Sequence, residues 1–143
     1  MILDSLLMFA DSQTVTGGTT TKSSNVIDVG TVARKLGTGH QLFLVIKVIS
    51  KSGGDSSDTF TFSLVTDDNS SITTGAVVAA SRTITGIANI TAGMQIVVPI
   101  PPGVAFERYI EVLYAVTADA VLVVDAYLTD QEPPEFTAYA DGI

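Results

Sequence analysis

The side chains able to do acid–base chemistry are few, and the first of them is a single histidine, His40. General acid–base catalysis needs a titratable group that is held beside a partner and tuned to the working pH. His40 follows the turn-forming run Gly37-Thr38-Gly39 and comes directly before an apolar segment. This position favours a turn or surface histidine over a general base.

Two carboxylates four residues apart, Glu107 and Glu111, raise glycosidase chemistry as a second possibility. Two carboxyl groups on either side of a sugar bond can act as acid and base, and strand alternation places both on one side. Sugar sites normally present tryptophan or several exposed aromatic rings, and this sequence has no tryptophan. We interpret the pair as part of a strand that faces water or a neighbouring subunit.

Nucleophilic and phosphate-binding motifs are absent from the sequence. Cysteine does not occur, and no serine lies in a G-x-S-x-G sequence. The Gly17-Gly18 and Gly53-Gly54 pairs are not followed by the helix and Lys-Ser/Thr of a phosphate-binding loop. We therefore expect no catalytic residue and no cofactor, and we do not expect an enzyme.

The run Asp67-Asp68-Asn69, followed by Ser70 and Ser71, offers oxygen atoms that could bind a hard cation such as calcium. The EF-hand pattern is not met, because the run lacks the central glycine and the final glutamate. Asp and Asn are also common turn residues, because their side chains bond to the nearby backbone. A solvated turn is the favoured interpretation, and we expect no metal.

The overall composition narrows the classes of partner. The chain has 143 residues, about one domain, and a formal net charge of -8. Such an acidic chain disfavours nucleic acid and anionic membranes as partners, and the longest apolar run, Leu42 to Ile46, is far too short to span a bilayer. Only 15% of the residues are charged, below the usual quarter, which predicts that much of the surface is hidden in an assembly.

Alternation of apolar and polar residues predicts strands almost throughout. In residues 59–66, Phe60, Phe62 and Leu64 point one way and hydroxyl side chains point the other. Residues 42–49 are apolar on both faces, which is typical of a central strand covered on two sides. Pro99 marks an edge, a bulge or a strand end. The expected strands are Gln13–Thr16, Asn25–Val29, Leu42–Ile49, Thr59–Thr66, Ala76–Ala79, Met94–Ile100, and the pair Phe106–Val116 and Val121–Thr129 joined by a turn.

The fold class predicted from this pattern is all-β, an antiparallel sandwich or barrel. We expect an N-terminal arm at residues 1–13, a domain at 14–129 and an acidic, proline-containing tail at 130–143. Residues 31–35 could form one helical turn. The apolar residues Leu3, Leu6, Leu7 and Phe9 of the arm, and Phe136 of the tail, either pack back on their own domain or cross to a neighbouring chain.

Several stretches in one order resemble the Bbp16-like cement (decoration) proteins of tailed bacteriophage capsids. The similarity covers roughly residues 2–128 and leaves the tail outside it. The matching stretches are Ile2–Thr16 at the start of the chain, Ser24–Gly30, Thr66-Asp67-Asp68-Asn69, and Pro99-Ile100-Pro101-Pro102-Gly103 followed by Glu107-Arg108-Tyr109-Ile110. None of these motifs is chemically diagnostic, so the order and spacing carry the resemblance.

The resemblance implies a jelly-roll sandwich of about eight strands with extended terminal arms. It implies a viral structural protein on the outer surface of the virion capsid, bound to a major capsid protein of HK97-like fold. The partners implied are further copies of the chain, as a homodimer or homotrimer, and the shell itself. A phage tail or head-fibre component and a carbohydrate-binding module are the alternatives.

Contact residues are expected in three places. They are Arg108 with Tyr109, the Pro101-Pro102-Gly103 turn, and the N-terminal arm. For Arg108 the alternative is a salt bridge to Glu107 or Glu111 within its own sheet. Low-entropy threonine side chains on strands also suit contact with a partner.

Overall fold

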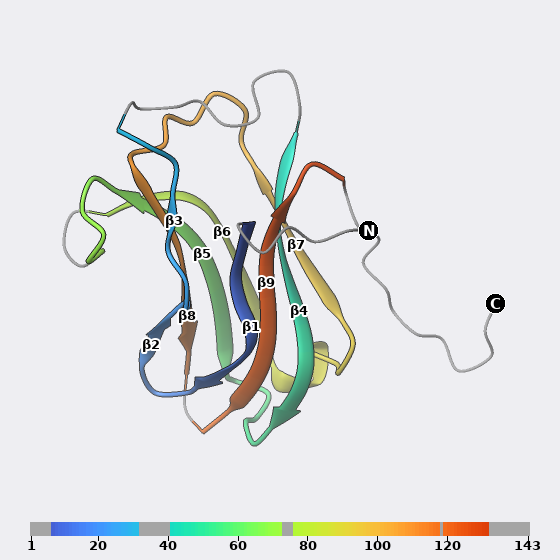
Figure 1. Ribbon diagram of the computed structural model, residues 1–143. Helices are drawn as coiled ribbons and strands as arrows, with labels where there is room; N and C mark the ends of the chain where they lie inside the picture. The colour runs from blue at the N-terminus through green and yellow to red at the C-terminus, as the bar shows by residue number, and fades with distance from the viewer. Residues whose placement is uncertain (1–6, 32–40, 73–75, 118, 132–143) are drawn as a thin grey trace.

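The computed structural model describes residues 7–31, 41–72, 76–117 and 119–131. Within these residues the chain forms nine strands, and all the strand pairs are antiparallel. The strands form two sheets that face each other as a sandwich (Figure 1). The predicted all-β fold class is confirmed.

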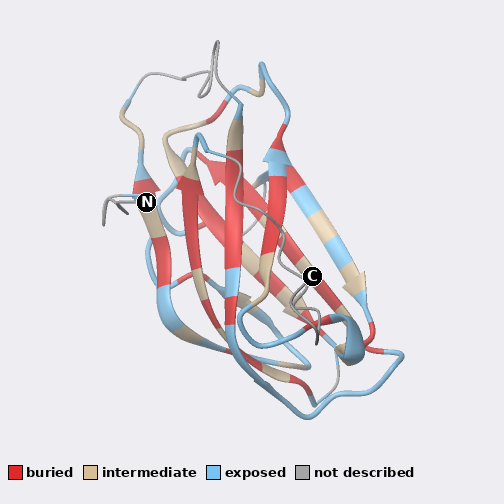
Figure 2. Cartoon of the chain, turned by 90° about the vertical axis from the view of Figure 1, so that its right-hand side faces the viewer, coloured by how far each residue is buried: buried red, intermediate tan, exposed pale blue. Residues whose placement is uncertain are grey.

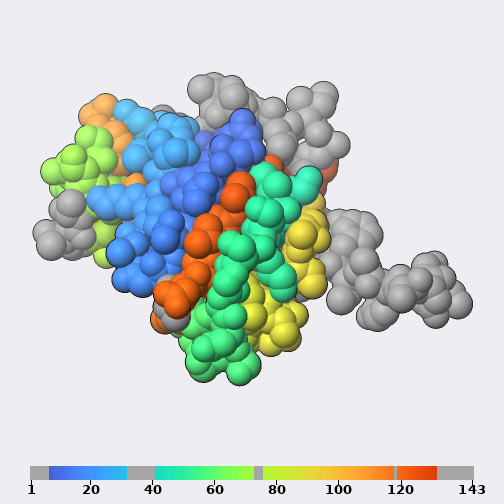
Figure 3. Space-filling view, turned by 90° about the horizontal axis from the view of Figure 1, so that it is seen from below, coloured from blue at the N-terminus to red at the C-terminus, as the bar shows by residue number. Residues whose placement is uncertain are grey.

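The first sheet, called sheet A here, has four strands. Its order is β1 (Met8–Thr16), β9 (Val121–Thr129), β4 (Leu42–Ser52) and β7 (Gln95–Ile100). Figure 3 shows these four segments side by side although they are far apart in the sequence. Pro99 lies in β7, which is an edge strand, as a residue without a backbone N–H requires.

The second sheet, sheet B, has the order β2 (Thr20–Lys22), β8 (Tyr109–Val116), β5 (Thr59–Asp67) and β6 (Val77–Thr85). The short strand β3 (Ile27–Asp28) pairs with the start of β8. A 3₁₀ turn, η2 (Ile87–Asn89), lies in the connection from β6 to β7.

The strand order is that of a jelly roll. The pairs β1–β9, β2–β8, β4–β7 and β5–β6 are all antiparallel, so that strands from the two ends of the chain wrap around the middle ones. At one side of the sandwich the Arg82 side chain of β6 donates from Nη1 to the Val97 carbonyl of β7, 3.0 Å away. This bond joins the edge of sheet B to the edge of sheet A.

The main core lies between the two sheets and takes inward-facing residues from the strands of both. Figure 2 shows that the buried residues are concentrated in the strands. Phe62 and Tyr114 meet there edge to face, with ring centroids 6.2 Å apart. Burial raises the pKa of Tyr114 well above its ordinary value. The largest fully buried side chains are Tyr114, Phe9, Phe60, Phe62, Phe106, Leu44, Ile46, Leu64, Ile72, Ile90, Ile96 and Ile110.

The glycine turn that follows β4 shows how the end of this strand is held in place. Gly53 follows β4 with φ of +66°, and a Cβ there would come within 2.5 Å of the Asp119 carbonyl oxygen. Only glycine combines this backbone conformation with so close an approach. The predicted turn therefore also holds the β4 end against the β8–β9 connection.

Four strand predictions need correction. The first strand begins at Met8, so part of the predicted arm at residues 1–13 belongs to sheet A. Strand β2 was missed, and β6 runs to Thr85 rather than ending near Ala79. The last two strands do not pair with each other, because β8 lies in sheet B and β9 in sheet A. The predicted β9 bounds are confirmed, while most of the possible helical turn at 31–35 lies outside the described residues.

Candidate functional site

The outer face of sheet B carries rows of hydroxyl side chains, and we call it the hydroxyl face. In one row, Thr20, Ala115, Thr61 and Thr83 lie opposite one another across four strands. The hydroxyls of Thr61 and Thr83 are 2.9 Å apart and hydrogen bonded. The other hydroxyl residues of this face on β5 and β6 are Thr59, Ser63, Ser81 and Thr85.

The cross-strand bonds hold this face in a fixed arrangement. The Ser63 and Ser81 hydroxyls are 3.0 Å apart in the row next to Thr61 and Thr83. Threonine is β-branched and stiff at χ1, and a side chain already held by a neighbour loses little freedom when a partner arrives. The exposed members of the face are Ser81, Thr83 and Thr85. They are neutral, so a partner that docks on them does not have to strip water from a charged group.

One end of the hydroxyl face is hollowed. An open depression of about 370 Å³ lies beside the β1–β2 turn and the starts of β5 and the β8–β9 connection. Threonines supply most of its lining: Thr19, Thr20, Thr59, Thr61 and Thr117. Its shape and lining suit a protruding polar loop of a partner better than a small apolar ligand.

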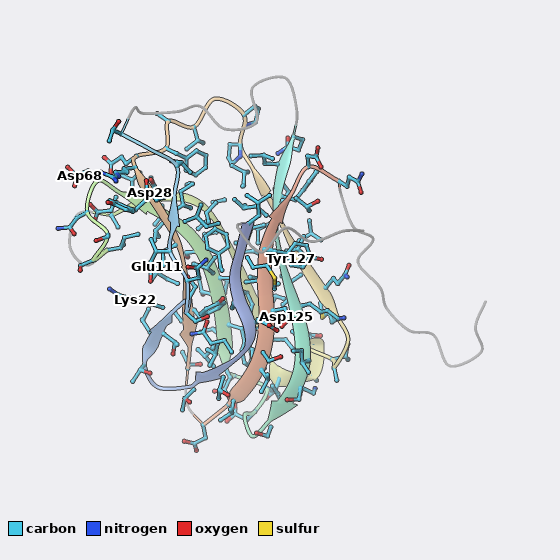
Figure 4. All side chains as sticks on the ribbon, in the orientation of Figure 1. Lys22, Asp28, Asp68, Glu111, Asp125 and Tyr127 are labelled. Atoms are coloured by element: carbon cyan, nitrogen blue, oxygen red, sulfur yellow. The ribbon has the colours of Figure 1, made fainter. Side chains whose placement is uncertain are left out.

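Two charged residues interrupt the neutral character of this face. Lys22 of β2 is exposed in the row of Ser63 and Ser81, whereas Glu111 is buried. It lies on β8 opposite Val65 of β5, and only 3% of it is exposed. Its Oε2 atom has no hydrogen-bond partner among the described residues. Burial raises the pKa of Glu111, and the nearby Lys22 ammonium opposes that rise. Figure 4 shows Glu111 and Lys22 on the same side of the sandwich.

The segment after β5 contacts Lys22, the cation near Glu111. Ile72 is 2% exposed, and the Lys22 Nζ atom donates a hydrogen bond to its carbonyl oxygen. Lys22 is thus held across the gap between β2 and the β5–β6 connection. Glu107, the partner of Glu111 in the predicted carboxylate pair, precedes β8, so strand alternation does not place the two side chains together.

The outer face of sheet A is different. Met8, Tyr127, Val45 and Val97 lie opposite one another across β1, β9, β4 and β7, and we call them the apolar row. Phe43 packs with them. Val45 is 0% exposed, Tyr127 3% and Val97 6%, although all three point away from the main core. The prediction that β4 is covered on both faces is confirmed.

A polar row follows the apolar row on the same face. Asp125, Lys47 and Gln95 lie opposite one another on β9, β4 and β7. Asp125 Oδ1 accepts a hydrogen bond of 2.7 Å from the Ser12 backbone N–H, at an irregular point of β1 where Ser12 has φ of 52°. The carboxylate thus satisfies a strand donor that the bulge leaves unpaired.

Arg108 directly precedes β8, and Tyr109 is the first residue of that strand. Arg108 binds Asp28 of β3 through Nε and Nη2, with the shortest ion-pair distance 3.0 Å. Its guanidinium also lies 5.0 Å from the centre of the Tyr109 ring. The expected alternative pairing of Arg108 with Glu107 or Glu111 is wrong, because β3 brings Asp28 to the start of β8. Hydrogen bonds from Arg108 and the Gly30 backbone lower the pKa of Asp28.

The other residues predicted at contacts fall into three groups. Pro101 and Pro102 are exposed, as is Leu7, which is 42% exposed. Phe9 is fully buried in the main core, so that this residue is not accessible to a partner and its assignment to a contact is corrected. Leu3, Leu6 and Phe136 lie outside the described residues, as does His40.

The Asp67–Asn69 run forms the predicted turn. Asp67 Oδ1 accepts a hydrogen bond from the Asn69 backbone N–H, and Asn69 Oδ1 accepts one from that of Ser71. In the part of the chain that the structure describes, no three Asp, Glu or His side chains gather as a metal-binding group. No helix among those residues is long and apolar enough to cross a bilayer.

The strands predicted from the sequence leave out about half of the residues of the hydroxyl face. Thr20 lies on β2, which was not predicted, and Ser81, Thr83 and Thr85 lie on the part of β6 beyond its predicted end. The signal was present, because polar and apolar residues alternate from Ser81 to Thr85. The pairing of these residues with β5 depends on register, which the sequence does not state.

The sequence matches the model of one protein family. The Bbp16 family model covers residues 9–123, which is most of the chain and nearly all of the sandwich. No curated protein matches the sequence.

Proposed function

Because this chain belongs to the Bbp16 family, a phage-associated family, we propose that it is a capsid cement protein. In this proposal it binds the outer surface of an icosahedral phage head and stabilises contacts between subunits of a major capsid protein. The jelly-roll sandwich suits this role because it presents broad, rigid sheet faces rather than a flexible binding loop.

The hydroxyl face is the observation that supports the proposal best. On β5 and β6 it combines neutral side chains with hydroxyls already bonded in pairs at 2.9 and 3.0 Å. Centres of protein interfaces are poor in charged residues. A face of this kind can dock on a shell with little loss of side-chain freedom and few charges to desolvate.

The net charge of the chain favours binding to the outside of a shell, where many copies can bind to one lattice. The formal net charge of -8 opposes contact with packaged DNA, which is itself a dense anion. Many copies on one lattice gain avidity when each contacts more than one subunit. We propose that the chain acts as a homodimer or homotrimer at such junctions, with a shell protein of HK97-like fold beneath it.

Binding to capsids that lack the protein tests this proposal. Purified chain is mixed with shells of the same phage, and the amount that sediments with them is measured. Thr83→Lys, at an exposed position on the hydroxyl face, should weaken binding at least about tenfold, because a lysine would be buried without a partner.

The matched control is Thr14→Lys, at an exposed position of β1 in sheet A. It makes the same chemical change on the opposite face and should bind as the wild type does. Failure of the wild-type chain to bind shells, with binding to tails or to glycans instead, would replace the cement function by one of those alternatives.

A further inference from the structure

We propose that strand β6 is where two copies of this chain pair, edge to edge and antiparallel, about a twofold axis. The B sheets of the two copies then form one continuous sheet across the dimer. The inference names a contact surface for the oligomer of the proposed function, yet it does not rest on the capsid role and is measured in solution.

The outer edge of β6 is open. This strand pairs with β5 on one side, and no strand among the described residues pairs with it on the other. Val77 and Val78, at its start, are 51% and 56% exposed, the largest values among the large apolar residues that the structure describes. A long edge strand with exposed apolar side chains is a ready template for another strand.

Two other sheet edges carry protection that β6 lacks. The edge of β1 is bonded to the segment at the end of β2: the Asn25 N–H donates to the Phe9 carbonyl over 2.9 Å, and the Gln13 side chain donates to the Lys22 carbonyl over 2.6 Å. Strand β7 has only six residues and contains Pro99. Strand β6 has nine residues and contains neither proline nor lysine.

The hydrogen bonds between β5 and β6 show which backbone groups face the open edge. The Gly86 N–H donates to the Asp58 carbonyl over 2.7 Å, in register with the pairing of the two strands. Bonded and non-bonded pairs alternate along an antiparallel ladder. The backbone N–H and C=O groups of Ser81 and Thr83 therefore point away from β5, toward the position that a further strand would take.

Charge selects a second copy as the occupant. The formal net charge is -8, so most surfaces of two copies repel each other. All 15 acidic residues lie outside residues 69–106, the stretch that contains β6, η2 and β7. Arg82 is the only charged residue of this stretch, and its guanidinium donates to the Val97 carbonyl of β7 over 3.0 Å. Two copies can therefore meet along β6 without bringing carboxylates of these strands together.

The strand is also suited to pairing with itself. A twofold axis makes a strand antiparallel to its own copy, and an axis through Ser81, the midpoint of β6, uses the whole strand. Arg82 then lies opposite Ala80 of the partner, so that the two guanidinium groups are not directly opposed. Pairing in the plane of the sheet leaves the hydroxyl face outward and continues it across the dimer.

Sedimentation velocity over a dilution series tests the proposal. The wild type should sediment as a dimer, with twice the 14.9 kDa of one chain. Thr83→Pro should be monomeric, because proline removes an N–H that faces the open edge and none that bonds to β5. Thr83→Val is the matched control and should stay dimeric, since it loses only the hydroxyl.

Val77→Lys/Val78→Lys is a second variant, which keeps the backbone intact and brings two lysines to the exposed end of β6. It should weaken the dimer at least about tenfold, and it serves if Thr83→Pro does not fold. A wild type that is monomeric at every concentration, or trimeric, would overturn the proposal, as would an undiminished dimer of the lysine variant. A monomeric wild type that still binds shells would leave the cement function standing.

Cross-linking locates the axis. The chain has no cysteine, so Ser81→Cys introduces a single thiol. Directly opposite residues in a bonded antiparallel pair have Cα atoms about 5.5 Å apart, within reach of a disulfide. Mild oxidation should therefore give a covalent dimer on a non-reducing gel, whereas the control Thr14→Cys, on β1, should give none. No cross-link at Ser81, or an equal one at Thr14, would contradict the assigned pairing.

Discussion

The two outer faces of this sandwich have opposite character. On sheet A the outward side chains of the central strands include Val45 and Tyr127, both nearly fully buried. On sheet B the outward side chains are hydroxyls such as Thr61 and Thr83, which bond to each other and reach solvent. One face is therefore apolar and buried along this row, while the other carries neutral hydroxyls that reach solvent.

The outer faces of sheet A and sheet B contribute differently to the stability of the fold. The apolar side chains buried on the outer side of sheet A contribute roughly 25 cal/mol for each Å² removed from water, so their burial adds to the stability of the fold. The hydroxyl face contributes little to folding but stays ordered, because its side chains already have partners. Substitutions on the two faces should accordingly give different results.

The largest effect is expected at Tyr127. Tyr127→Ala should lower the free energy of unfolding by about 3 kcal/mol, because it leaves a cavity in a packed apolar cluster. Thr83→Ala on the exposed face should lower it by less than about 1 kcal/mol. Urea unfolding of both variants measures the contrast, and equal losses would show that the two faces do not differ in this way.

The next effect depends on pH and concerns Glu111. Because burial raises its pKa above the ordinary 4.5, the folded chain holds the proton more tightly than the unfolded chain does. The free energy of unfolding should thus fall as the pH rises from 4.5 through the raised pKa, and stay lower above it. Glu111→Gln should remove this fall and stabilise the chain by about 1 kcal/mol at pH 7.

Thermal unfolding between pH 3.5 and 7.5, about the range around the ordinary carboxyl pKa, measures the change. Glu107→Gln is the matched control, since Glu107 is less buried and lies before β8. It should keep the wild-type pH dependence. A Glu111→Gln profile parallel to that of the wild type would contradict the assigned cost of burying this carboxylate.

A smaller effect is expected from the hydroxyl pair. In a double-mutant cycle of Thr61→Val and Thr83→Val, the coupling free energy should be about 0.5 kcal/mol, as for other cross-strand hydroxyl pairs. Ser63→Ala and Ser81→Ala provide a second double-mutant cycle on the same face. Coupling close to zero in both cycles would mean that the face is not pre-organised.

The smallest effect is expected at the Arg108–Asp28 ion pair, whose side chains are 41% and 44% exposed. Asp28→Asn should change the Tm less than any variant above, because water and salt screen an exposed pair. The lowered pKa of Asp28 fixes the sign: its stabilisation is present at neutral pH and is lost as the pH falls through the folded pKa. A larger change at pH 2 than at pH 7 would contradict this.

Short-range patterns were enough to predict most of the strands. The segment Thr59 to Thr66 alternates, and β5 follows it; the segment Leu42 to Ile49 is apolar on both faces, and β4 is covered on both. Both patterns depend only on neighbouring residues, so no knowledge of pairing was needed.

The parts that could not be predicted depend on distant residues. Arg108 binds Asp28, 80 positions away, and Glu111 is buried near Lys22, whose ammonium bonds to the Ile72 carbonyl. The hydroxyl face forms only when β5 pairs in register with β6 and β8. Register and crossover come from the whole fold, so these features became visible only in the structure.

The most direct test of the central proposal is electron cryomicroscopy of phage heads carrying the wild-type chain. We predict density for the sandwich on the outer surface of the shell, with β5 and β6 of sheet B turned toward the capsid protein. Heads prepared with Thr83→Lys should lack that density, whereas heads with Thr14→Lys should keep it. Density found on tails or fibres, or with sheet A against the shell, would contradict the proposal.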